Sequence, residues 1–121
     1  VQTVLALMQL AILQSGGRTL ALLLRELQDE DELFASPNTL AEVEQQLLIM
    51  AQTLSHLPEA LQLNLPQLDW HGWGVLQTLL EQSGSARREA VWYALKALVP
   101  ATLDMLHQLR QRHPVWFDMK L

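Results

Sequence analysis

The chain has 121 residues, of which 50% are apolar and 17% are charged, and its formal net charge is −5. This balance excludes intrinsic disorder, and a chain of this length is expected to form one domain over residues 1–121. Eight Lys and Arg residues spread along the chain are too few to neutralise a nucleic-acid backbone, so we expect no RNA or DNA binding. Cysteine is absent, which excludes thiolate chemistry and fits a cytoplasmic protein.

The first segment, residues 1–14, is apolar on nearly all sides, and Gln2 and Gln9 form its polar edge. Such a helix is expected to be buried on most of its circumference, between other helices or against a second subunit. Gly16-Gly17 predicts a kink or a short break in this helix. The leucines of residues 20–27 then resume a helical stripe.

The longest apolar run, residues 4–13, covers ten residues, whereas a membrane-spanning helix needs roughly 20. We therefore expect no transmembrane helix. A signal peptide is not expected either, because no basic segment precedes the run. The chain begins at Val1 instead of methionine, which leaves room for preceding residues.

An acidic run at residues 29–32 is interpreted as a solvated connector. Ser36-Pro37 then predicts a helix start, and Thr39 and Glu42 add a second capping signal. A continuous apolar seam predicts a long helix that Pro58 ends. The seam consists of Leu40, Val43, Leu47, Met50, Leu54 and Leu57.

Residues 58–69 are expected to form a loop with one helical turn, and residues 70–82 a shorter helix. A turn follows, in which Ser85 is placed to cap the last helix, residues 86–112. Pro100 is expected to bend or split that helix. The predicted fold is therefore all-α, an antiparallel bundle of four to five helices.

Six short motifs follow one another along the chain: Asp31-Glu32-Leu33-Phe34-Ala35, Leu47-Leu48-Ile49-Met50-Ala51-Gln52-Thr53, Leu57-Pro58-Glu59, Pro66-Gln67-Leu68-Asp69-Trp70, Val91-Trp92 and Val99-Pro100. In this order they resemble the HepT-like branch of the HEPN superfamily, the helical toxins of prokaryotic toxin–antitoxin pairs. The resemblance spans roughly residues 20 to 110 and implies the same helical fold.

The departures from the family pattern all concern its R-x4–6-H ribonuclease motif. Counting from Trp70, the family's arginine position falls on Gln77 and its histidine position on Glu81 or Gln82. An acidic position on the second helix is occupied by Gln52. RNA cleavage requires a group that transfers protons near neutral pH and a cation that stabilises the phosphate, and glutamine supplies neither.

Other candidate site residues are Trp70, His71, Trp73, Arg87 and Arg88. Trp70 is expected in the core, whereas for Trp73 the core, a ligand pocket and a dimer contact all stay open. His71 is expected to be a surface or half-buried residue. The four histidines form no helical metal-binding pair, so no metal is predicted, and no cofactor motif is present.

The resemblance implies a non-catalytic HepT-like protein that acts through protein–protein contacts. It further implies a homodimer with its cleft at the subunit boundary and an MNT-type nucleotidyltransferase as partner. Two alternatives stay open. One is a divergent HEPN ribonuclease that uses His71 with Arg87 or Arg88, or residues from both subunits across the dimer. The other is a bundle that binds a small molecule or nucleotide near Trp70, Trp73 and the glutamines of the former cleft.

Overall fold

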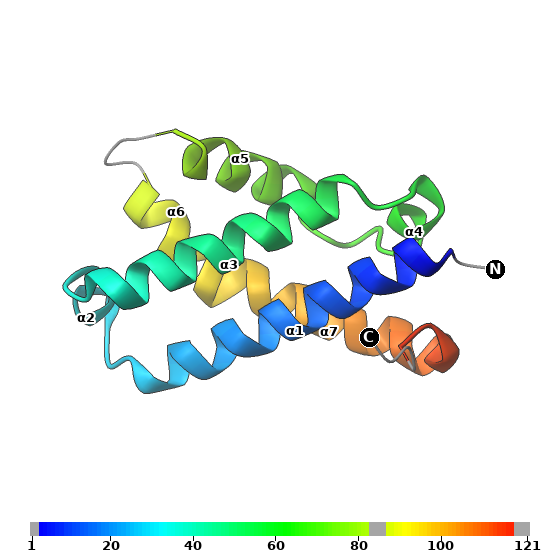
Figure 1. Cartoon of the computed structure of the whole chain (residues 1–121), viewed down its shortest axis with the longest axis horizontal. Helices are drawn as coiled ribbons and strands as arrows, with labels where there is room; N and C mark the ends of the chain where they lie inside the picture. The colour runs from blue at the N-terminus through cyan, green and yellow to red at the C-terminus, as the bar shows by residue number, and fades with distance from the viewer. Residues whose placement is uncertain (1–2, 83–86, 118–121) are drawn as a thin grey trace.

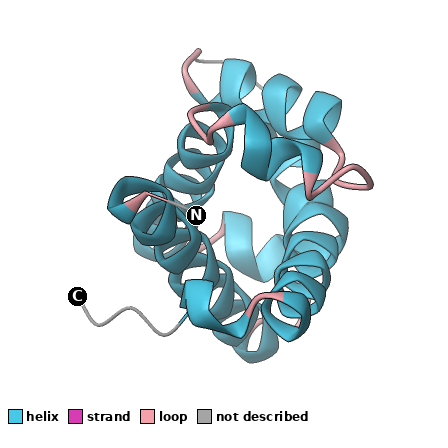
Figure 2. Cartoon of the chain, turned by 90° about the vertical axis from the view of Figure 1, so that its right-hand side faces the viewer, coloured by secondary structure: helices cyan, strands magenta, loops and turns pink. Residues whose placement is uncertain are grey.

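The computed structural model describes residues 3–82 and 87–117, and every regular element in these two ranges is helical (Figure 2). The predicted all-α class is therefore confirmed for the described part of the chain. The elements are α1 (Val4–Glu26), α2 (Glu30–Phe34), α3 (Pro37–Ser55), α4 (Glu59–Leu63), α5 (Trp70–Leu80), α6 (Arg87–Tyr93), the π-helical segment η1 (Ala94–Leu98), α7 (Val99–Arg112) and the short 3-10 helix η2 (Pro114–Phe117).

The long helices pack around one apolar core. In Figure 1, α3 runs between α1 and α5, and α7 lies behind this layer. Helix α1 contacts α3 and α7, α3 contacts α5, and α5 contacts α6. One cluster of buried apolar side chains draws on every helix from α1 to α7. This packing fixes the relative positions of α1, α3 and α5, between which the candidate site lies.

Helix α1 is continuous through Gly16 and Gly17, so a break at these glycines, one of the two predicted outcomes, was wrong. Both glycines are buried because neighbouring helices approach α1 closely there. A Cβ atom on Gly16 would lie 3.3 Å from Cγ of Met50 on α3. A Cβ atom on Gly17 would lie 2.6 Å from Cδ2 of Leu103 on α7. The two glycines therefore serve helix packing.

The faces of α1 are used differently from the sequence prediction. Gln9, predicted at a polar edge, is only 8% exposed, whereas Val4 and Leu5 are each 65% exposed. Met8 and Ile12 are also exposed. Among the described residues, α1 is the one helix whose length and composition would allow it to cross a membrane, a test that core helices of bundles also pass. The apolar run of ten residues counted in the sequence is therefore much shorter than the helix, which has 23 residues.

The start of α3 follows the Ser36-Pro37 signal, with Pro37 as the first helical residue. The second capping signal was wrong, since Thr39 and Glu42 both lie inside the helix. The predicted seam forms the buried side of α3, except that Leu40 is only partly buried. The helix ends at Ser55, before Pro58, which becomes the N-cap of α4.

The last long helical stretch changes from π-helical to α-helical just before Pro100, where η1 meets α7. The backbone at Leu98 and Val99 stays helical, so Pro100 lies inside a continuous helical stretch, and the wider turns of η1 accommodate its missing N–H. Ser85, the predicted cap of this stretch, lies outside the described residues.

Candidate functional site

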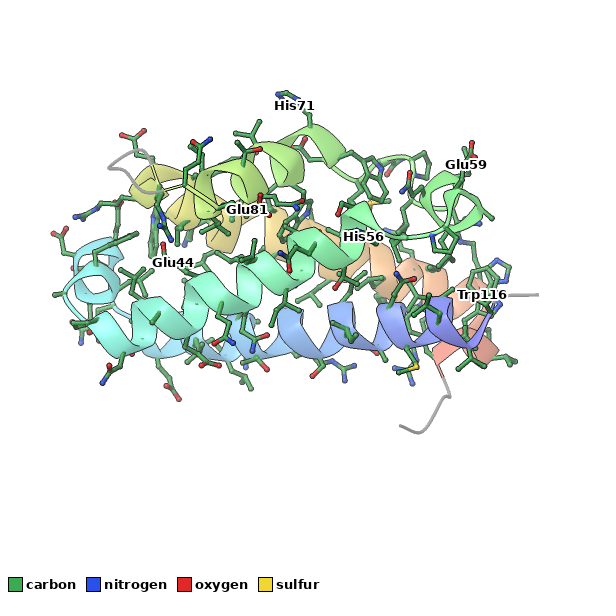
Figure 3. The ribbon with its side chains drawn as sticks, turned by 45° about the horizontal axis from the view of Figure 1, so that its top comes forward. Glu44, His56, Glu59, His71, Glu81 and Trp116 are labelled. Atoms are coloured by element: carbon green, nitrogen blue, oxygen red, sulfur yellow. The ribbon has the colours of Figure 1, made fainter. Side chains whose placement is uncertain are left out.

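An open groove of about 500 Å³ crosses α3 between α1 and α5. We call it the polar groove. It is lined by Gln9, Gln52, Thr53, His56, Gln77 and Glu81. His56 and Glu81 lie on the two neighbouring helices α3 and α5, as Figure 3 shows. Two of the three glutamines in this groove, and Glu81, occupy positions that the sequence aligned with the family's motif.

Helix periodicity brings the α3 and α5 residues to the groove. Gln52 and His56 are four residues apart, so they lie one above the other on one face of the helix. Gln77 and Glu81 have the same spacing on α5 and its C-cap. The second assignment for the histidine position, Gln82, does not line the groove. Its backbone carbonyl instead accepts a hydrogen bond from Arg87 Nη1 at 3.0 Å.

Hydrogen bonds fix the orientation of four groove side chains. Gln9 Nε2 donates to the backbone oxygen of His56 at 3.1 Å, and Gln77 Nε2 donates to Glu81 Oε1 at 3.2 Å. The Thr53 hydroxyl donates to the backbone oxygen of Ile49 at 2.7 Å. Nδ1 of His56 lies 2.7 Å from the backbone oxygen of Gln52. Because a carbonyl oxygen only accepts, Nδ1 carries the hydrogen in this bond.

Trp73, for which the sequence left the core, a ligand pocket and an interface open, is part of the core. Its side chain is 2% exposed, and Nε1 donates to Thr102 Oγ1 at 3.1 Å. Trp70 was expected in the core but is only partly buried, and its Nε1 donates to the backbone oxygen of Leu65 at 3.1 Å. Tryptophan is amphipathic, so the chain pattern alone did not determine which ring would turn inward.

Arg87 and Arg88 are held in ion pairs at the other end of α5. Arg87 Nη2 lies 2.7 Å from Glu44 Oε2, and Arg88 Nη2 lies 2.6 Å from Asp31 Oδ1. The Arg88 guanidinium also pairs with Glu30 and stacks over the Phe34 ring. Hydrogen bonds to Asp31 and Glu30 raise the pKa of Arg88, so it stays charged at every ordinary pH. The acidic run is therefore an ion-pair partner of Arg88 in part, and the interpretation as a solvated connector was incomplete.

His71 is exposed and points away from the polar groove (Figure 3). It lines a second, mostly apolar groove of about 380 Å³ between α5 and α6, together with Val75, Glu89 and Tyr93 among others. Arg87 contacts Gln82 beyond the far end of α5, and about 16 Å of helix separates positions 71 and 82. The structure therefore does not bring His71 together with Arg87 or Arg88.

Gln9, Thr53 and His56 were not predicted as site residues. His56 could have been found, because it follows Gln52 by one helical turn on the same predicted helix. Gln9 could not, since its place in the groove depends on how α1 packs on α3. No group of three His, Asp or Glu side chains in residues 3–82 and 87–117 is placed to hold a metal ion.

A comparison of the chain with protein-family models, with curated proteins and with solved structures gives no match. The chemistry of the polar groove therefore has to be argued from its own geometry.

Proposed function

We propose that this chain is a HepT-like helical protein of the HEPN superfamily that has lost its ribonuclease centre and acts through protein–protein contacts. One observation carries the proposal. Gln52 on α3 and Gln77 on α5 are far apart in the sequence, and the resemblance aligns each of them with a family position, yet both line the polar groove, where Glu81 follows Gln77 by one helical turn. A chance alignment of motifs would not be expected to collect these positions in one place.

The groove has only half of the chemistry that RNA cleavage needs. His56 provides an imidazole in the groove, although the family's histidine position itself holds none. None of the lining side chains is Lys or Arg, so nothing in the groove neutralises a phosphate as negative charge develops. This supports a binding role over the ribonuclease alternative.

The exposed apolar patch of α1 supports a homodimer. Val4, Leu5, Met8 and Ile12 form this patch near the start of the helix. Leu5 and Ile12 lie within roughly 40–60° of Gln9 around the helix axis, so the patch borders the polar groove. A two-fold contact through the patch would place the groove at the subunit boundary, as the resemblance implies.

Light scattering coupled to size-exclusion chromatography tests the homodimer. We expect the wild-type chain to elute as a dimer and the double variant Leu5→Glu/Ile12→Glu as a monomer, with dimer affinity about 100-fold weaker or more. Leu22→Glu is the matched control, since Leu22 is an equally exposed leucine at the far end of α1. A monomeric wild type, or equal loss of the dimer in the control, would contradict this interface.

The partner is tested by affinity capture from the native host followed by mass spectrometry. The expected partner is a small nucleotidyltransferase of the MNT type, and its absence from the captured proteins would count against the HepT-like assignment.

A second candidate function is small-molecule binding, which the open groove itself favours. The pocket that the sequence placed at Trp73 does not form, because that ring is buried. Gln52 and Gln77, the glutamines that the same hypothesis named, do line the polar groove.

A further inference from the structure

We infer that the outer side of α1 and α7 binds an acidic helix of another protein. The surface consists of two adjoining pockets, of about 200 and 240 Å³, which share Arg18. We call it the arginine strip, and its main residues are Arg18, Leu22 and Arg25 of α1 and His107 of α7. The strip does not include the exposed patch at the start of α1, so the inference does not depend on the proposed homodimer.

The charges of the chain are unevenly distributed over the fold. Ten carboxylates lie in residues 29–89, and the two basic residues of that segment, Arg87 and Arg88, are both held in ion pairs. Helices α1 and α7, which contact each other, have the opposite balance. They carry four arginines against two carboxylates, namely Arg18, Arg25, Arg110 and Arg112 against Glu26 and Asp104. An anionic partner is therefore attracted to this side of the molecule and repelled by the other.

Arg18 and Arg25 have no ionic partner within the part of the chain that the structure describes. The ion pairs found there are those of Arg87 and Arg88. Both Arg18 and Arg25 are exposed, so an incoming carboxylate can reach them without displacing another group. A guanidinium also matches a carboxylate in shape, because two parallel N–H groups can donate to its two oxygens.

Helix periodicity places a leucine between the two arginines. Arg18, Leu22 and Arg25 are spaced by four and three residues, so they follow one another along one face of α1 over about 10 Å. The Leu22 side chain is 59% exposed. The complementary surface is a helix with the reverse pattern, in which two carboxylates seven residues apart flank an apolar side chain.

Helix α7 forms the second wall of the strip. Leu106 lines the pocket from the buried side, and His107 lines it from the exposed side. An imidazole carries at least one N–H group in any tautomer, so His107 adds a donor and no negative charge. None of the described side chains that line the two pockets is acidic. The charged contacts that the strip can make are therefore with anions.

An RNA backbone is the competing occupant, because Arg18 and His107 place a cation and an imidazole in one pocket. The charge of the whole chain favours the acidic helix. Tight RNA binding depends on many phosphate contacts, whereas the strip has two arginines on a chain of net charge −5. Leu22 favours the helix too, since a helix can place an apolar side chain between its carboxylates and a phosphate backbone cannot.

The test is a fluorescence-anisotropy titration of the full chain against a labelled helical peptide of about 14 residues. The peptide has two glutamates seven residues apart with two leucines midway between them, and a second peptide has lysines in place of the glutamates. We expect the glutamate peptide to bind in a saturable way and the lysine peptide to bind roughly 10-fold more weakly or less. A single-stranded RNA of about the same length is expected not to bind.

The variant Arg18→Glu/Arg25→Glu should reverse this preference. We expect it to weaken the glutamate peptide roughly 10-fold or more and to gain binding of the lysine peptide, a gain that unfolding cannot produce. Arg110→Glu/Arg112→Glu is the matched control, because it makes the same charge change at two arginines of α7 that line neither pocket. The control should keep the preference for the glutamate peptide.

Three results would overturn the inference. The first is no saturable binding of the glutamate peptide at its highest soluble concentration. The second is an equal loss of binding in the strip variant and in the control, which would mean attraction to the net charge alone. The third is tighter binding of the RNA than of the glutamate peptide, which would assign the strip to a nucleic acid.

Discussion

The two sides of α5 use polar groups in opposite ways. On the inward side, the indole N–H of Trp73 donates to the hydroxyl of Thr102, which in turn donates to the backbone oxygen of Leu98 at 2.8 Å. Each of these polar groups has a hydrogen-bond partner, so the polar groups on the inward side stabilise the core. On the outward side, Gln77 and Glu81 bond to each other and still leave acceptors in an open groove.

The comparison teaches that complete hydrogen bonding marks a structural role and incomplete bonding marks a site. The same criterion separates the ion-paired arginines from the polar groove. The criterion holds for Arg88, which bonds to Asp31 and Glu30, and less well for Arg87, which bonds to Glu44 and to the Gln82 carbonyl but has a buried Nε without a partner among the described residues, as Gln9 Oε1 has. Residue type alone had favoured the arginines and Trp73 as candidates.

The largest difference between the two sides should appear in stability. Trp73→Ala is expected to lower the free energy of unfolding by about 3–5 kcal/mol, because it leaves a large cavity and removes the N–H donor from the buried Thr102 oxygen. Gln77→Ala on the outward side should change it by less than about 0.5 kcal/mol. Urea denaturation followed by circular dichroism measures both values. Equal effects of the two substitutions would contradict the division of α5 into a structural side and a site side.

A smaller effect is expected for Arg87. Its side chain is 28% exposed and that of Glu44 is 23% exposed, so Arg87→Ala leaves a half-buried carboxylate without its cation. We expect a loss of about 1–2 kcal/mol. A double-mutant cycle with Glu44→Ala, measured by the same denaturation, isolates the pair. Additive effects would show that the ion pair contributes nothing and that Arg87 is free for another role.

Much of the fold could be predicted because it depends on local pattern. The seam of α3, the start at Pro37 and the change of helix type near Pro100 follow from side-chain spacing and from proline geometry. The continuity of α1 could not be predicted in this way. Gly16 and Gly17 usually weaken a helix, and here close contact with α3 and α7 outweighs that cost.

The site was predicted only in part for a similar reason. Motif counting placed Gln77 correctly and left the histidine position on Glu81 or Gln82, of which Glu81 lines the groove and Gln82 does not. Periodicity would have added His56. The contribution of Gln9 depends on the packing of α1, which brings a polar residue of an otherwise apolar segment under His56. Tertiary contacts of this kind leave no local signal in the sequence.

The central claim is that the polar groove binds without cleaving, because it lacks a cation. The most direct measurement is an RNA-cleavage assay on metal-free wild-type protein, with His56→Ala prepared in parallel. The account predicts that neither protein cleaves RNA above the blank. Cleavage by the wild type that is lost in His56→Ala would contradict it, since His56 would then work as an acid or base with a cation supplied from elsewhere.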